Sequence, residues 1–239
     1  IGTIPMMITG ANPFEAYKII IQGSLSRPIY VKQTIKIAVP LLGCALAIAP
    51  CFKMRFWNIG AEGQITAGAI AATYFALYWH DKLPKPILLA IMFLSAAIAG
   101  GFWAFIPGFF KAKWNTNETL FTLMMNYVAI QLVAYFSVVW ENPKGSGNIG
   151  VINPNTQVGW FPDLFGSKYA LNIIIVALLT IGLYIYLNYT KHGYEISVVG
   201  DSAGTARYAG MKVNTIVLRT VFLSAALIGL VVFRRKVVR

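Results

Sequence analysis

The sequence predicts an all-α, polytopic transmembrane helical bundle. Its composition is 57% hydrophobic and only 12% charged, with a mean hydropathy of +0.64, a balance that a water-soluble domain would not keep in solution. Its apolar segments have about the 20 residues that a spanning helix needs, instead of the roughly ten-residue alternating strands of a transmembrane barrel. We therefore expect a multi-pass membrane protein with a single transmembrane domain over residues 1–239.

Six segments have the length and composition of spanning helices: 31–52, 64–79, 86–110, 118–140, 170–189 and 215–233. Residues 1–9 resemble the end of another span, and the chain begins inside this apolar run without a methionine, so we expect a truncated N-terminus. Residues 10–30 start with a turn and continue with apolar residues at helical spacing, which predicts an interfacial helix.

The formal charge of +12 raises the question of a polyanionic partner. The basic residues are scattered through short loops between the spans and form no continuous basic face. We therefore expect the lipid bilayer as the partner of these charges, and no nucleic acid.

A polar stretch, residues 58–64, separates the first two spans and contains Asn58, Glu62 and Gln64. One interpretation is structural: Asn58 caps a helix that starts near Ile59, and Glu62 lies in the first turn, where the helix dipole favours an acid. The other interpretation is functional: a helix that starts within the membrane, with polar side chains around its first turn, lines the path of a polar substrate.

Glu118, Thr122 and Asn126 recur every four residues and form a polar stripe on the fourth span. A polar face exposed to hydrocarbon is costly, so the stripe must face the bundle interior or a wet cavity. Hydrogen bonding between helices and contact with substrate both fit this pattern. A stripe of small residues on the second span predicts close packing against a neighbouring helix; it comprises Gly60, Gly68, Ala72 and Ala76.

Two longer hydrophilic segments, 141–169 and 191–214, separate the later spans. The first is compatible with an ordered or a flexible loop. In the second, Asp201 or Ser202 can cap a short helix that Gly210 closes. The face of that helix that carries Ala203, Ala206 and Arg207 is available, on this pattern, for docking on a partner.

The sequence contains no pattern that indicates catalysis, a cofactor or a metal. A phosphate-binding G-x-x-x-x-G-K-[ST] loop is missing, and residues 200–210 lack the lysine that such a loop needs. His80 and His192 lie far apart, without clustered carboxylates, so we interpret both as loop residues and predict no metal site. We therefore expect a chain that is not an enzyme.

Three motifs occur in order: Phe56–Gln64, Asn117–Glu118 followed by Met125–Tyr127, and Val199–Met211. Together they resemble the permease subunits of bacterial ABC importers for nucleosides and simple sugars, a family that also includes ribose and branched-chain amino acid permeases. The resemblance extends from about Ala11 to Leu230, and three ordered motifs are far more specific than any one of them.

The resemblance implies a type II ABC importer-like fold in the bacterial cytoplasmic membrane. It implies a second permease subunit in a heterodimer, cytoplasmic ATPases that bind and hydrolyse ATP, and an external substrate-binding protein. The cytoplasmic loop 191–214 would carry the coupling helix, Ser202–Ala209, which transmits the ATPase movement to the bundle. The implied coupling residues are Gly200, Ser202, Ala206, Arg207 and Gly210, and the implied pathway residues are Asn58, Glu62, Gln64 and Asn126.

The NIGAEGQ form of the first motif is most similar to the nucleoside branch, so we expect a nucleoside importer, with a ribose-like sugar permease as the alternative. An ion-coupled secondary transporter would show inverted repeats and paired broken helices, and only one clear break is visible; a membrane scaffold subunit is the remaining class. Family members continue past Leu230 into further helices, whereas this chain turns to a basic tail, so we also expect truncation at the C-terminus.

Overall fold

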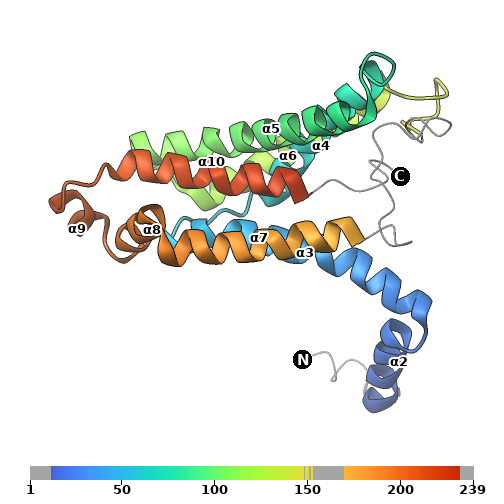
Figure 1. The fold of residues 1–239 in the computed structure, drawn as a ribbon, viewed down its shortest axis with the longest axis horizontal. Coiled ribbons are helices and arrows are strands. Elements are labelled where there is room, and N and C mark those ends of the chain that lie inside the picture. The colour runs from blue at the N-terminus through green and yellow to red at the C-terminus, as the bar shows by residue number, and fades with distance from the viewer. Residues whose placement is uncertain (1–11, 148, 151, 153–169, 232–239) are drawn as a thin grey trace. The chain divides into compact units, whose positions relative to one another are not determined.

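The computed structural model describes residues 12–147, 149–150, 152 and 170–231, and all regular elements within these ranges are helices (Figure 1). The chain separates into two units, residues 1–41 and 42–239. The predicted span at 1–9 lies outside the described residues.

The first unit contains α2 (Pro13–Leu25) and the N-terminal part of α3 (Pro28–Lys53). Asn12 caps α2, because its Oδ1 accepts a hydrogen bond of 3.0 Å from the Phe14 amide. Thr34 Oγ1 donates to the Ser24 carbonyl at 3.2 Å and joins the two helices. The helix expected within residues 10–30 is therefore confirmed, with its first residue at Pro13.

Among its described residues, the second unit contains the rest of α3 and seven further helices. The helices predicted for the spans are confirmed, with these bounds: α4 (Ala61–Tyr78), α5 (Lys85–Trp114), α6 (Glu118–Val139), α7 (Ala170–Tyr189) and α10 (Val213–Val231). Within the described ranges, α3, α5, α6, α7 and α10 are long and apolar enough to cross a membrane. The shorter α4 is outside this set, and its first turn carries the polar Glu62 and Gln64.

The bundle is built around α5, which packs against α4 and α10, while α4 also packs against α6. Small residues allow these close approaches. A Cβ on Gly100 would lie 2.9 Å from the Ala225 carbonyl oxygen, and a Cβ on Gly68 would lie 3.0 Å from the Ala96 oxygen. Ala72 and Ala76 are buried on the same face of α4, which confirms the close packing predicted from the small-residue stripe.

The hydrophilic segment 191–214 contains more structure than the sequence predicts. It forms two helices, α8 (Lys191–Asp201) and α9 (Ala203–Tyr208). The interpretation of His192 as a loop residue is wrong, because it lies in the first turn of α8. The apolar residues of α8 are few, but Ile196 and Val199 are three positions apart and therefore lie on one face of the helix. Both are buried in a cluster that also contains Cys51 and Ile216.

In the segment after α6, the Glu141 carboxylate accepts hydrogen bonds from the amides of Gly145 at 2.7 Å and Gly147 at 3.2 Å. This carboxylate therefore orders the turn that follows the helix. Residues 153–169, most of the loop for which order and flexibility were both open, lie outside the described residues.

Candidate functional site

The polar stretch 58–64 is buried and internally hydrogen-bonded. Asn58 and Gln64 are each only 1% exposed. Asn58 Nδ2 donates to Gln64 Oε1 at 3.3 Å, and Gln64 Nε2 donates to Asn58 Oδ1 at 2.9 Å. The Gly60 amide also donates to Asn58 Oδ1, at 3.1 Å. These two amide side chains therefore satisfy each other and close the turn before α4.

Side chains of the polar stripe on α6 form hydrogen bonds with the backbone of this turn. Asn126 Oδ1 accepts from the Gly63 amide at 2.9 Å, and Asn126 Nδ2 donates to the Ile59 carbonyl at 3.1 Å. Thr122 Oγ1 accepts from the Ile59 amide at 3.2 Å. Glu118, Thr122 and Asn126 are all buried, as expected for a stripe that faces the bundle interior or a wet cavity.

The structure corrects the expected cap of α4. The helix begins at Ala61 and its N-cap position is Gly60, so Asn58, which was predicted to be the N-cap, lies two residues before it. The first amides of a helix have no partner within the helix, and for α4 the Gly63 amide finds its partner on α6. Asn126 thus supplies, from another helix, the acceptor that an N-cap side chain normally supplies.

Two glycines allow α6 to lie close to the turn before α4. A Cβ on Gly60 would lie 3.1 Å from Thr122 Cβ, and a Cβ on Gly63 would lie 2.7 Å from the Trp103 indole nitrogen and 3.0 Å from Asn126 Oδ1. A side chain at Gly63 would therefore displace the indole or the amide that caps α4.

Glu62 differs from its neighbours because it is exposed. It lies in the first turn of α4, as predicted, where the helix dipole favours a carboxylate. Within the described residues it has no ion-pair partner, whereas Glu118 forms an ion pair of 2.9 Å with Lys111. The structure therefore separates the four predicted pathway residues into a buried framework (Asn58, Gln64 and Asn126) and one available acid.

The second predicted group lies on α8 and α9. Ser202 caps α9, because its Oγ accepts from the Thr205 amide at 3.2 Å, and Gly210 ends it with a φ of 76°. Arg207 and Tyr208 are exposed, Tyr208 at 97%. The expectation that Ala206 belongs to a docking face is wrong: this side chain is 0% exposed and packs into the chain's own core.

Gly200 lies where α8 meets the end of α3. A Cβ at this position would collide with the Lys53 carbonyl oxygen and lie 3.2 Å from Met54 Cα. Gly200 is thus a contact between α8 and α3 and is itself buried.

Sequence reasoning missed an ion-pair network on α8. Arg219 Nη2 on α10 donates to Glu195 Oε2 at 2.8 Å, and His192 Nδ1 lies 3.5 Å from the same oxygen. The hydrogen bond from Arg219 is the main cause of a lowered Glu195 pKa, to which His192 also contributes. An arginine inside an apolar span was the available signal, because such a charge needs a partner.

Comparison with known proteins places these features in a family. Residues 31–232 match the family described as branched-chain amino acid transport system / permease component. The glucose ABC transporter permease protein of Haloferax volcanii is 30% identical over 96% of this chain and 63% of its own length. The guanosine ABC transporter permease protein of Bacillus subtilis is 29% identical over 96% of this chain and 66% of its own length.

The nucleoside ABC transporter permease protein of Lactococcus lactis is 26% identical, again over 96% of this chain and 65% of its own length. The chain thus spans just under two thirds of the length of these relatives. No solved structure matches the chain significantly. With a family match over most of its length and five membrane-compatible helices among its described residues, the chain is a multi-pass membrane protein that belongs to the family of branched-chain amino acid transport system permease components.

Proposed function

We propose that this chain is the permease subunit of an ATP-driven importer that moves nucleosides across the membrane. Two of the relatives are named as permeases for guanosine and for nucleosides. The Haloferax relative, named as a glucose permease, supports a simple sugar as the second candidate. In both cases the chain would be the membrane path, and a separate ATPase subunit would bind ATP.

The observation that carries this proposal is the contrast between Glu62 and the residues around it. Asn58, Gln64 and Asn126 use their polar groups on one another and on the backbone. Their packing fixes the first turn of α4 and leaves Glu62 exposed. A carboxylate can accept hydrogen bonds from the hydroxyl groups of a ribose or a hexose. Glu62 is therefore the proposed substrate contact, and the other three residues position it.

The α8 and α9 segment is the proposed connection to the ATPase. Arg207 and Tyr208 on α9 are exposed and would form the docking surface together with Ala203. The ion pair between Glu195 and Arg219 would transmit a displacement of α8 to α10. A second permease subunit would complete the path, and an external binding protein would deliver the substrate.

The test is uptake by the protein reconstituted in vesicles with its second permease subunit, its ATPase and its binding protein. We expect ATP-dependent accumulation of radiolabelled guanosine, and accumulation of glucose instead would establish the sugar alternative. Uptake that continues without ATP and follows an ion gradient would refute the proposal.

The role of Glu62 is tested with Glu62→Gln, which keeps the shape of the side chain and removes its charge. We expect uptake to fall at least tenfold with unchanged membrane insertion, because one charge-assisted hydrogen bond contributes about 1.5–3 kcal/mol. The matched control is Glu15→Gln, the same change at another exposed acid in a first helical turn. Uptake by Glu62→Gln at the level of this control would reduce Glu62 to a helix-start residue.

A further inference from the structure

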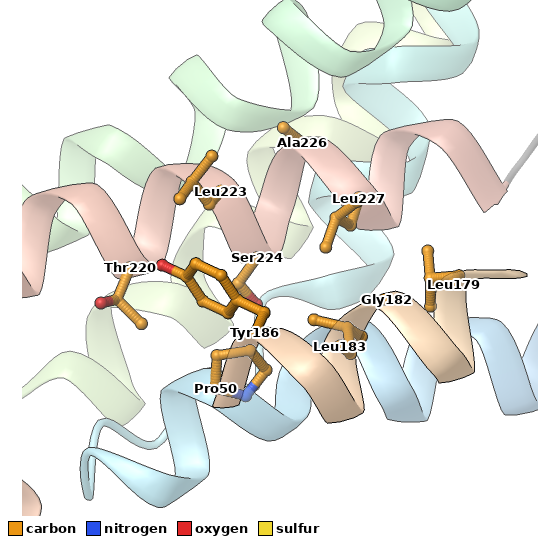
Figure 2. Close-up of a pocket in the computed structure, with 10 residues that line it drawn as sticks. All are labelled: Pro50, Leu179, Gly182, Leu183, Tyr186, Thr220, Leu223, Ser224, Ala226 and Leu227. Atoms are coloured by element: carbon orange, nitrogen blue, oxygen red, sulfur yellow. The ribbon is translucent and has the colours of Figure 1, made fainter. Parts of the chain in front are cut away.

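A pocket of about 310 Å³ lies between α7 and α10 and reaches Pro50 of α3 (Figure 2). Its volume is within the range of small-molecule sites. Most of its lining is aliphatic and comes from the two facing helices: Leu179, Leu183, Leu223 and Leu227. At Gly182 an added Cβ would meet no atom within 4 Å, so space is left on the α7 side. The pocket thus offers an apolar slot between two helices that can cross a membrane.

One end of this slot is polar. The hydroxyl oxygens of Tyr186 and Thr220 lie at one end of the pocket, and Leu179 lies at the other (Figure 2). Both hydroxyl groups are buried without a hydrogen-bond partner among the described residues, and Thr220 is only 1% exposed. Since an unsatisfied buried polar group costs about 1–3 kcal/mol, two at one place indicate a missing partner.

A positive charge lies at the same end. The Arg219 guanidinium lies close to the Tyr186 hydroxyl and is paired through Nη2 with Glu195 Oε2 at 2.8 Å. Its Nε is a third buried donor without a partner among the described residues. Lys53 Nζ donates to the carbonyl of Leu187, the residue after Tyr186, at 3.3 Å. Two hydroxyl groups and an arginine N–H beside a lysine favour a ligand that presents acceptor oxygens and negative charge.

The polar end also lies at the edge of the spans. Tyr186 is three residues before the last residue of α7, and Lys53 is the last residue of α3. Leu179 is ten residues before the end of α7, which is about 15 Å deeper along the helix. An amphiphile whose charged group lies at the helix ends and whose chain runs inward has the orientation of a bilayer lipid.

We propose that this pocket binds an anionic phospholipid, with one acyl chain along Leu179, Leu183 and Leu227 and phosphate oxygens that accept hydrogen bonds from Tyr186, Thr220 and Arg219. The ligand satisfies the buried donors and fills the apolar slot. It also reaches Arg219, which connects α10 to α8, so lipid charge would act on the same ion pair. The inference is independent of the transported substrate.

The test is lipid binding to the intact, delipidated protein, measured by native mass spectrometry with phosphatidylglycerol and phosphatidylcholine of identical acyl chains. We expect at least a tenfold preference for phosphatidylglycerol, and a reduction of that preference by about tenfold in the Tyr186→Phe, Thr220→Val double variant. Equal binding of the two lipids, or an unchanged preference in the double variant, would overturn the proposal.

The apolar half of the pocket is tested with Gly182→Leu, which places a side chain into the open space. Its control is Gly23→Leu, because Gly23 on α2 also has no atom within 4 Å of an added Cβ. We expect Gly182→Leu to abolish phosphatidylglycerol binding and Gly23→Leu to retain it. Equal lipid binding by the two variants would show that a lipid does not fill the slot.

Discussion

Replacing Asn126 with leucine tests whether this residue is framework or pathway. The change keeps the size of the side chain and removes both hydrogen bonds, so the Gly63 amide and the Ile59 carbonyl lose their partners. Each unsatisfied buried group costs about 1–3 kcal/mol, so we expect a loss of roughly 2–6 kcal/mol of stability. For a chain of this size that corresponds to a decrease of roughly 5–20 °C in the unfolding midpoint.

The assay is thermal unfolding of the purified protein in detergent, followed in parallel with uptake in vesicles. Thr122→Val removes a single hydrogen bond to Ile59, so it should lower the midpoint by about half as much. Gln131→Leu is the matched control, because Gln131 is an exposed residue on the same helix.

An Asn126→Leu protein that unfolds at the temperature of the Gln131→Leu control would refute the cap assignment. If that stable variant also failed to transport, Asn126 would be a pathway residue, as the family resemblance implied. A large loss of stability identifies its main role as holding the first turn of α4.

Three further predictions concern the α8 segment. Glu195→Gln should lower stability by about 1 kcal/mol and reduce the uptake obtained per ATP hydrolysed. The charge-swapped double variant Glu195→Arg, Arg219→Glu should restore part of both, and no recovery in it would contradict a direct interaction between residues 195 and 219. Because Arg219 holds the Glu195 pKa below its usual range, the stability from this pair is complete above the ordinary glutamate pKa of about 4.3 and disappears as the pH falls through the lower folded pKa. The difference in unfolding midpoint between wild type and Glu195→Gln should therefore shrink as the pH falls below the ordinary glutamate range, and a constant difference would refute this. Gly200→Ala should separate α8 from the end of α3 and lower both stability and uptake, whereas Gly204→Ala, whose Cβ would lie 3.6 Å from Ser202 Oγ, should have little effect; equal behaviour of the two variants would contradict the contact.

The sequence alone predicted most of the helices, because a run of about 20 apolar residues is a local property that needs no knowledge of neighbours. It also predicted the buried stripe of α6, since a four-residue repeat of polar groups defines one helix face. The sequence also placed α9 between a cap at Asp201 or Ser202 and Gly210, because caps act within a few residues; the structure shows that Ser202 is the cap.

The tertiary structure decided which partners these residues have. Gly63 and Asn126 are 63 positions apart, and Glu195 and Arg219 are 24 apart. No local pattern pairs such residues; their contacts exist only after α4 packs on α6 and α8 on α10. Packing also buries Ala206 in the core, although its position on the predicted helix suggested a docking face. The polar stretch between the first two spans could be located from the sequence. Only the packing of α6 against it showed which of its polar residues are buried and hydrogen-bonded and which, Glu62, is exposed.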